Sequence, residues 1–406
     1  MNIIFIHQNF PGQFRHVAKY LSNLAGVNVL SISQKQAPGL SGIRNYVYAA
    51  QRSVTCGIHP YLASTEACVL NGQEVGRVLL ALRDQGFVPD VVIAHAAWGE
   101  ALYVKDIFPA VPVIGFFEFF YRVRGADVDF DPEFPLKLDG ALRVRTRNAT
   151  HLLSLDAVDV GVTPTVWQRS VFPEGYHAKL RVIHEGVRTD LASFGAQSRG
   201  VELPSGQIIR AGDPVVTYVA RNLEPYRGFH VFMRAVDLLL QQNDRVRVIV
   251  IGGDDVSYGN RLQDGDTYRE RALKEMSSPH ERIAFLGQVP YQKYLQVLAV
   301  SSVHVYLTVP FVLSWSMLEA MSMGCLVLGS DTPPVREVIE HGKNGLLVDF
   351  FSPAAIAAAM GRVLAEPASF VALRQAARKT VLDKYSLNQG LDGYRRLLAE
   401  VMLNNL

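Results

Sequence analysis

Cysteine is scarce in this chain, which argues against a fold held together by disulfides. The 406 residues include only three cysteines, Cys56, Cys68 and Cys325, and no CxxC pair. Their odd number and mostly apolar or small neighbours favour buried thiols in a reducing compartment. We therefore expect a cytoplasmic protein, with a peripheral position at the inner face of the membrane as the alternative.

Long hydrophobic runs are also missing. No uncharged stretch reaches the roughly 18 to 20 apolar residues that would span a bilayer. The stretch MNIIFIHQNFPGQF lacks a basic leader and a small-residue cleavage pattern, so we interpret it as a first strand and not as a signal peptide. Residues 115–125, GFFEFFYRVRG, mix aromatic side chains with arginines. We interpret them as a buried strand that runs into a loop, and peripheral contact with a membrane is the alternative.

An excess of one charge is absent too. The chain has 40 lysines and arginines against 38 aspartates and glutamates, which leaves a formal net charge of +2. This balance argues against a nucleic-acid partner, so any anion site must be local. The hydrophobic fraction of 49% and the charged fraction of 19% are typical of a soluble globular protein.

The length and the pattern of the chain predict two α/β domains. At 406 residues it is too long for one compact core, so we expect two domains of roughly 200 residues each. Strand-length apolar runs alternate with amphipathic helical patterns, which is typical of doubly wound parallel sheets. Residues 192–214 are rich in Gly, Ser and Pro and place the boundary. We predict domains over residues 1–200 and 201–385, and a carboxyl-terminal helix over 386–406 that packs back toward the first domain.

Strands and helices can be placed within each domain. The strand-like runs of the first domain are residues 2–8, 27–33, 90–95, 111–117 and 158–164, and the domain closes near 180–187. Those of the second domain are residues 214–222, 246–253, 282–289, 303–308, 325–330 and 345–349. One helical face is predicted from Phe14, Val17, Ala18, Leu21 and Leu24, and another from Phe229, Phe232, Met233, Val236 and Leu240.

The first loop after a strand argues against a dinucleotide cofactor. Ligands of open parallel sheets bind beyond the carboxyl ends of the strands. There the loop HQNFPGQF has a single glycine, Gly12, where a nicotinamide or flavin fold would have GxGxxG. A turn before a helix is the simplest interpretation of Gly12. The alternative is that Gly12 lets the backbone approach a phosphate or a sugar.

Two arginines follow the first strand of the second domain. Arg221 lies at the end of that strand, and Arg227 lies just before the next helix. Two guanidiniums beside a helix amino terminus suit a diphosphate, because their N–H groups and the helix dipole both favour anions. Surface arginines in a charged loop are the alternative.

A lone carboxylate, Glu319, stands in the apolar run TVPFVLSWSMLEAMSMG. A helix that begins near Ser314 to Ser316 would leave its first amides free to hold phosphate. It would also put Glu319 in the first turns, where the dipole stabilises the ionised form. A carboxylate there can accept the paired hydroxyls of a ribose, and a role limited to the dipole is the alternative.

These motifs resemble those of the retaining nucleotide-sugar glycosyltransferases of family 4, the group 1 transferases with the GT-B fold. ARNLEPYRG resembles their phosphate loop, with Arg227 where lysine is usual, and residues 318–349 are similar to their donor motif. DVVIAHAAWGE resembles the strand that carries their active-site histidine, and FPGQFRHVA their first glycine loop. Residues 117–134 are similar to the subgroup found in exopolysaccharide assembly.

The resemblance implies a fold and an activity. The fold is GT-B, with two doubly wound domains facing across a cleft, the first on the acceptor side and the second binding the donor. The implied enzyme moves a hexose-type sugar from a nucleotide diphosphate sugar to a glycan, lipid-linked or other hydroxyl acceptor. It does so with retention, without a metal or another cofactor, in the biosynthesis of a cell-surface polysaccharide or glycoconjugate.

The resemblance also implies roles for single residues. His95 touches the donor sugar and orders the reaction centre, with a structural histidine as the alternative. The diphosphate contacts are Arg221 and Arg227, and the ribose contact is Glu319. The remaining implied positions are Glu337 near the donor and His184 on the acceptor side, and we expect Gly287 and Val289 beside the base and Tyr121 on the acceptor side. Glu118 is a further acceptor-side candidate, because a carboxylate within an aromatic run has a raised pKa unless it is paired, and pairing with Arg122 or Arg124 is the alternative.

One position departs from the family pattern. The family has two glutamates separated by seven residues, and the position of the first is occupied by Phe311. Ser314 and Ser316 offer hydroxyls nearby and Trp315 an aromatic face, with plain packing as the alternative. The missing acid leaves two other hypotheses open: a nucleotide-sugar epimerase on the same scaffold, and a non-catalytic sugar-binding or scaffold subunit.

The segment ADVDFDPE formally contains a DxD motif, which metal-dependent transferases of another fold use. Asp127, Asp129 and Asp131 alternate along it. The spacing lacks the glycine and the distal glutamate of a calcium loop, and aspartates before proline are common in turns. We therefore predict a turn, or a loop near the acceptor, and no metal site.

Overall fold

The structure, a computed structural model, describes residues 1–191 and 200–403. It divides into two compact units, one made of Met1–Gly186 and Leu387–Leu406 and the other of Val187–Ser386. The division at Gly186 comes before the expected boundary at residue 200, because Leu191 and Val201 are buried in the hydrophobic core of the second unit. Part of the expected linker, residues 192–199, lies outside the described residues.

The first unit is built on a seven-stranded sheet with the order β3-β2-β1-β4-β5-β6-β7. All neighbouring strands are parallel. The strands are β1 (Asn2–Ile6), β2 (Asn28–Gln34), β3 (Arg44–Tyr48), β4 (Val91–His95), β5 (Val113–Phe116), β6 (Val160–Thr163) and β7 (Leu180–Val182). The direction of winding reverses between β1 and β4, so loops diverge at that point of the carboxyl edge.

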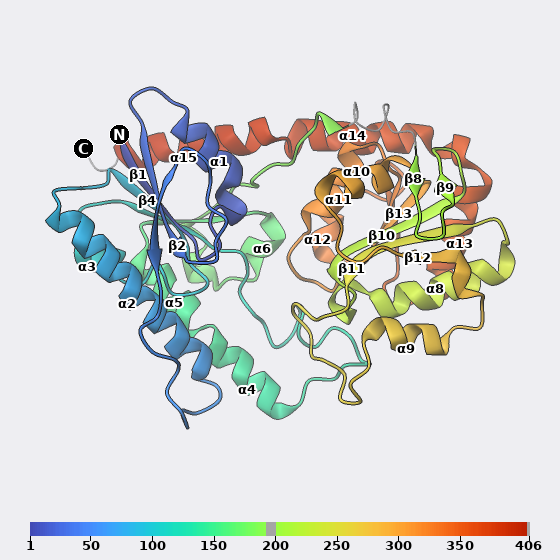
Figure 1. Cartoon of the computed structure of the whole chain (residues 1–406), viewed down its shortest axis with the longest axis horizontal. Coiled ribbons are helices and arrows are strands. Elements are labelled where there is room, and N and C mark those ends of the chain that lie inside the picture. The colour runs from blue at the N-terminus through green and yellow to red at the C-terminus, as the bar shows by residue number, and fades with distance from the viewer. Residues whose placement is uncertain (192–199, 404–406) are drawn as a thin grey trace. The chain divides into compact units, whose positions relative to one another are not determined.

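Helices cover both faces of the first sheet (Figure 1). They are α1 (Arg15–Ser22), α2 (Ala63–Asp84), α3 (Val104–Ile107), α4 (Leu138–Arg147), α5 (Ala149–Ala157), α6 (Val166–Ser170) and α15 (Leu387–Leu403), with short 3-10 turns η1 (Gly12–Phe14) and η2 (Glu174–Tyr176). Helix α15 belongs to this unit although it follows the second unit in the sequence. Its Tyr394, Leu397 and Leu398 share one buried cluster with Phe14 and Val17.

The second unit has a six-stranded parallel sheet with the order β12-β11-β10-β13-β14-β15. Its strands are β10 (Val215–Asn222), β11 (Arg247–Gly253), β12 (Ile283–Phe285), β13 (Val303–Tyr306), β14 (Val327–Ser330) and β15 (Leu346–Val348). Its helices are α8 (Phe229–Gln242), α9 (Tyr268–Glu275), α10 (Tyr291–Ala299), α11 (Trp315–Ser322), α12 (Pro333–Arg336), α13 (Pro353–Ala365) and α14 (Val371–Lys384), with 3-10 turns η3 (Pro225–Arg227), η4 (His280–Arg282) and η5 (Pro367–Phe370). The switch point of this sheet lies between β10 and β13.

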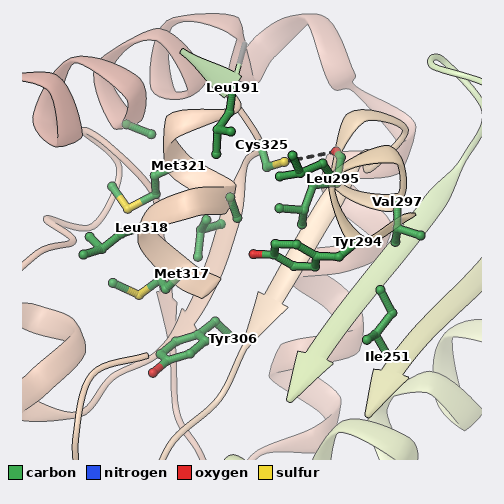
Figure 2. Packing of buried hydrophobic residues seen from close by; sticks show 14 of the residues in the cluster. Leu191, Ile251, Tyr294, Leu295, Val297, Tyr306, Met317, Leu318, Met321 and Cys325 are labelled. Atoms are coloured by element: carbon green, nitrogen blue, oxygen red, sulfur yellow. Dashed lines mark hydrogen bonds between the residues drawn. The ribbon is translucent and has the colours of Figure 1, made fainter. Parts of the chain in front are cut away.

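The core of the second unit fixes the spacing between α10 and α11. Figure 2 shows Met317, Leu318 and Met321 of α11 beside the residues that α10 contributes. All three are fully buried, and the Cys325 thiol donates a hydrogen bond to the Leu298 carbonyl oxygen at 3.2 Å. Close packing on this scale leaves little freedom for one helix to shift against the other.

The predicted strands are all present in the described residues, and the structure adds β7, where the first domain was expected to close, and three others. Strand β3 was not expected, and the antiparallel hairpin of β8 (Val201–Glu202) and β9 (Ile208–Ile209) lies inside the segment that was expected to be irregular. The predicted face of α8 is buried throughout, but Leu24 lies beyond the end of α1 and is exposed. Cys56 is exposed as well, so the expectation of buried thiols is wrong for this residue.

Among the described residues, no single helix is both long and apolar enough to cross a bilayer. The helix pair Pro353–Ala365 and Pro367–Lys384 has the length and composition of a span only when taken together, and it is bent by 103°.

Gly228 offers a test of how tightly α8 is joined to β13. Its φ is +62°, and a Cβ atom there would lie 2.6 Å from the Leu307 Cβ. We expect Gly228→Ala to lower the free energy of unfolding by roughly 2 to 5 kcal/mol, because left-handed backbone strain and a steric clash add up. Gly324→Ala is the control, since Gly324 has a φ of +81° and no atom within 4 Å. Equal losses for the two variants in urea unfolding would contradict the packing argument.

Candidate active site

The carboxyl edge of the first sheet brings two histidines together at the switch point. His7 follows β1 and His95 ends β4, and these two strands are parallel neighbours. Their ring centroids are 5.0 Å apart in an edge-to-face arrangement. Residues far apart in the sequence therefore meet where an open α/β sheet binds its ligands.

His95 is fully buried and is held in one orientation. Its ring stacks on Trp98 with the centroids 4.0 Å apart, and the Ala97 N–H donates to its Nδ1 at 3.3 Å. Burial lowers the pKa of His95 well below its ordinary value, and the nearby His7 and His151 act in the same direction. The ring is therefore neutral, with its proton on Nε2, which is buried and has no hydrogen-bond partner in the described parts of the chain. This atom is a ready donor for a ligand.

His7, Gln13 and Glu118 form a hydrogen-bonded chain beside this ring. The Gln13 Oε1 lies 2.8 Å from His7 Nε2. The Nε2 of the same Gln13 side chain donates to Glu118 Oε1 at 3.2 Å. Gly12 is required here, because its φ is +43° and a Cβ atom would lie 2.3 Å from His7 Nε2. The sequence pointed to Gly12 and Glu118 but gave no reason to connect them through His7 and Gln13.

The loop that carries Trp98 is packed against α2. The Asn71 side-chain amide donates to the Trp98 carbonyl oxygen at 3.1 Å. Gly99 has a φ of +91°, and a Cβ atom at this position would lie 2.1 Å from the Cys68 carbonyl oxygen. Farther along the loop, Glu100 is fully buried and accepts a hydrogen bond from the Tyr48 hydroxyl at 2.7 Å. These contacts fix the aromatic face on which His95 stacks.

The remaining acceptor-side candidates lie away from these histidine contacts. Tyr121 is held through its backbone by the Asn148 side chain, and the Arg147 guanidinium lies 3.9 Å from the centroid of its ring. His184 follows β7 and its Nδ1 accepts from the Gly186 N–H at 2.9 Å. Burial lowers the pKa of His184 to about 4, so it is neutral near pH 7 even though Glu185 is 3.9 Å away.

The segment 127–131 forms a turn, as its sequence predicts. Asp127 and Asp131 are buried and Asp129 is exposed. The Glu133 N–H donates to Asp131 Oδ1 at 3.0 Å, which is the side-chain hydrogen bond of an aspartate turn.

In the second unit, the two predicted arginines have different environments. Arg221 is the last residue but one of β10 and is exposed, and none of the contacts among the described residues gives its guanidinium a partner. Arg227 is only 9% exposed. Its Nη1 donates to the Tyr306 hydroxyl at 3.0 Å, to Thr308 Oγ1 at 2.9 Å and to the Val312 carbonyl oxygen at 3.0 Å. The sequence predicted that both would lie at the carboxyl edge but not that one would be buried there.

Phe311 packs into an aromatic cluster next to Arg227. It is 3% exposed, and its ring lies 4.8 Å from that of Tyr258 and 5.4 Å from that of Tyr226. The Tyr258 loop is anchored by buried Glu224, which accepts the N–H groups of residues 257, 258 and 259 at 3.0, 3.1 and 2.8 Å. Carbon atoms therefore occupy the position at which the family pattern has an acid.

Glu319 lies in α11, which begins as predicted. Ser314 is the N-cap, and its Oγ accepts the Ser316 N–H at 3.3 Å. The two carboxylate oxygens of Glu319 accept hydrogen bonds from Tyr291 at 2.7 Å and from Tyr294 at 2.9 Å. Burial raises the pKa of Glu319, while the two hydroxyls and Arg188 lower it. The tyrosines were missed, because only the folded chain brings α10 and α11 together.

The other donor-side candidates are spread over this unit. The Gly287 carbonyl oxygen accepts from the Gly252 N–H at 3.1 Å, and Val289 packs on the core. Trp315 is 39% exposed at the start of α11. Glu337 lines a surface groove of about 640 Å³ between the segment 336–347 and α14. No contact in the described part of the chain joins Glu337 to Glu319.

Known proteins match both units. Residues 25–192 match the profile described as "Glycosyl transferase family 4 group", and residues 203–380 match that of "Glycosyl transferases group 1". The chain belongs to glycosyltransferase family 4. The predicted family is confirmed.

Relatives of this glycosyltransferase agree with the assignment. It is 23% identical to the D-inositol 3-phosphate glycosyltransferase of Corynebacterium jeikeium (strain K411) over 361 residues, which are 86% of this chain and 82% of the relative. The structure of Anabaena HepE in complex with UDP superposes with a TM-score of 0.69 at 16% identity, covering 98% of this chain and 100% of HepE. Sucrose-phosphate synthase from Thermosynechococcus elongatus gives 0.69 at 18% identity with the same coverage. These likenesses confirm the predicted GT-B fold.

The buried pair of Tyr48 and Glu100 predicts a pH-dependent stability. Burial raises the pKa of Glu100 from 4.5 to about 7, against the opposing effect of the Tyr48 hydrogen bond. The folded chain then retains a proton that the unfolded chain releases, so the contribution of Glu100 to stability falls as the pH rises from about 4.5 to 7. We expect Glu100→Gln to remove this loss, on the order of 3 kcal/mol in the difference between the two unfolding free energies.

Urea unfolding of the wild type and Glu100→Gln at several pH values measures this difference. Glu281→Gln, at an exposed position, is the matched control. Parallel pH curves for the wild type and Glu100→Gln would show that Glu100 does not hold the proton.

Proposed function

We propose that this glycosyltransferase moves a sugar from a nucleoside diphosphate sugar to a hydroxyl acceptor, with retention and without a metal ion. The observation that carries the proposal is the clustering of Arg221, Arg227 and the start of α11 at the carboxyl edge of one sheet. Two cations beside the positive end of a helix dipole suit a diphosphate. HepE, which has a similar fold, has been crystallised with UDP-glucose, which supports this class of donor.

The two arginines stabilise the diphosphate in different ways. Arg227 is a buried cation held by neutral oxygens, so its positive potential is fixed in place before a ligand arrives. Arg221 is exposed and can turn its guanidinium toward the phosphate oxygens. Stabilising the departing diphosphate lowers the barrier to cleavage of its bond to the sugar.

The ribose and the sugar use other residues. Glu319 accepts the ribose hydroxyls, and the backbone near Gly287 and Val289 lies beside the base. On the first unit, the His95 Nε2–H donates to the donor sugar, because it is a buried donor at the carboxyl end of β4 that has no hydrogen-bond partner among the described residues. Glu118, linked to His7 through Gln13, is the acid we assign to the acceptor.

Retention follows from a same-face displacement. The bond between the anomeric carbon and the diphosphate oxygen breaks as the acceptor oxygen forms its new bond on that face. The leaving diphosphate oxygen takes the proton of the acceptor hydroxyl. Phe311 is a hydrocarbon and cannot form a glycosyl intermediate, so this route needs no protein nucleophile.

The acceptor is a hydroxyl of a sugar or a cyclitol, as the relative named D-inositol 3-phosphate glycosyltransferase suggests. We propose assembly of a cell-surface polysaccharide or glycoconjugate as the pathway and the cytoplasm as the location, with peripheral contact at the membrane where the acceptor is lipid-linked.

A thermal-shift screen with uridine, guanosine and adenosine diphosphate sugars tests the donor class. A ligand at 100 times its dissociation constant should stabilise the protein by about 2.7 kcal/mol. Donor hydrolysis is then measured without an acceptor. Slow release of the free nucleotide supports a transferase. Binding without release supports the scaffold alternative, which the buried Phe311 favours, and conversion of the donor sugar to its epimer would indicate an epimerase.

The arginines yield a prediction with an internal control. We expect Arg221→Ala and Arg227→Ala each to lower kcat/KM, because each variant loses a charge-assisted contact to the diphosphate. The loss should correspond to about 2 to 3 kcal/mol of transition-state stabilisation. Arg227→Ala should also lower the melting temperature, since three buried oxygens lose their donor, whereas Arg221→Ala should not.

Arg245→Ala is the matched control, because Arg245 is exposed before β11 at the opposite edge of the same sheet. Unchanged kinetics for Arg221→Ala, or a loss for Arg245→Ala of the same size, would count against the assignment.

A further inference from the structure

The carboxylate of Glu319 is held by two phenols, and nothing in the catalytic scheme above uses them. Tyr291 is the first residue of α10 and Tyr294 lies three residues later, so both project from one face of that helix. Each donates to a different oxygen of Glu319, at 2.7 and 2.9 Å. One donor on each oxygen fixes both the position and the rotation of the carboxylate plane.

We propose that Tyr291 and Tyr294 are positioning residues that orient Glu319 for a vicinal diol, an inference that rests on the proposed ribose contact. A carboxylate has about four lone-pair sites, of which the tyrosines occupy two. The remaining two, one on each oxygen, can accept the two adjacent hydroxyls of a ribose. A carboxylate that rotated freely would have to lose that freedom on binding.

The two tyrosines differ in how firmly they are held. Tyr294 is 7% exposed and belongs to the core cluster that joins α10 to α11, and Figure 2 shows its ring extending from α10 toward α11. Tyr291 is 44% exposed at the rim. Packing therefore holds the Tyr294 hydroxyl firmly in place. At the rim, a water molecule can replace the Tyr291 hydroxyl as hydrogen-bond donor to Glu319.

Burial and the nearby charges keep the hydroxyls of Tyr291 and Tyr294 protonated, so that both can donate hydrogen bonds. Burial and the neighbouring carboxylate both raise the pKa of Tyr291, and they raise that of Tyr294 as well, so both stay protonated at neutral pH. Arg188 is the cation near Glu319, and its guanidinium is paired with Asp190 at 2.6 Å. The hydrogen bonds and this cation favour the ionised carboxylate, against burial.

The test compares nucleotides that have and lack the diol. Uridine, guanosine and adenosine diphosphates and their 2′,3′-dideoxy analogues are titrated calorimetrically into the wild type, Tyr291→Phe, Tyr294→Phe and Glu319→Gln. We expect Tyr294→Phe to weaken binding of the ribonucleotide about tenfold and Tyr291→Phe somewhat less, with the dideoxy analogue changed less than twofold. Tyr268→Phe is the control, since its hydroxyl donates to the Asn260 carbonyl oxygen elsewhere in the unit.

A second measurement tests whether the tyrosines act on the Glu319 carboxylate itself or only stabilise the surrounding fold. Loss of a tyrosine donor raises the pKa of Glu319 further, so on acidification the ribonucleotide should be lost at a higher pH in the tyrosine variants than in the wild type. Tyr268→Phe should follow the wild-type curve.

The outcomes distinguish this inference from the proposed function. Equal weakening for ribo and dideoxy nucleotides, or no weakening, in the tyrosine variants overturns the positioning role. If Glu319→Gln still discriminates between the two nucleotides, the ribose contact itself is wrong and both proposals fail at this residue. If Glu319→Gln loses discrimination while the tyrosine variants keep it, only the positioning role fails. Binding of none of the three nucleotides overturns the inference together with the proposed donor class.

Discussion

A buried guanidinium organises the second unit. The Arg227 side chain connects η3 to β13 and to the loop that follows it, through the Tyr306 hydroxyl, Thr308 and the Val312 carbonyl oxygen. Its own carbonyl oxygen accepts the hydroxyl of Tyr218 in β10 at 2.6 Å. A buried charge must be compensated, and here three neutral oxygens and the nearby Glu224 carboxylate compensate it. Arg227 thus helps to hold the loop 308–313 and Phe311 in place, together with the Ser330 hydroxyl, which bonds to the backbone of Thr308.

Both units use their switch points in the same way. In the first unit, neighbouring strands β1 and β4 deliver His7 and His95 to one place. In the second, neighbouring strands β10 and β13 deliver Arg221 and the oxygens that hold Arg227. The first place supplies a neutral hydrogen-bond donor and the second supplies cations.

Much of this architecture could be predicted from the sequence, because buried parallel strands appear in it as continuous apolar runs. Strand β3 escaped prediction because RNYVY is a short edge strand that begins with two polar residues and has no continuous apolar run, and the hairpin of β8 and β9 escaped because its strands are two residues long. Arg221, Glu319 and His95 could be placed from their positions at strand ends and a helix start. The burial of Arg227 and the contacts of Tyr291 and Tyr294 could not, because they depend on tertiary distances that no local pattern encodes.

The order of the units along the chain has a consequence for biosynthesis. Residues 187–386 form a unit whose two ends pair, since the Val187 N–H donates to the Tyr385 carbonyl oxygen at 2.8 Å, while α15 returns to cover Phe14 and Val17. A ribosome therefore releases every residue of the second unit before it releases the helix that completes the first core. During that interval the apolar face around Phe14 and Val17 lacks the helix that covers it in the folded chain, and exposed apolar surface of this kind favours aggregation of folding intermediates.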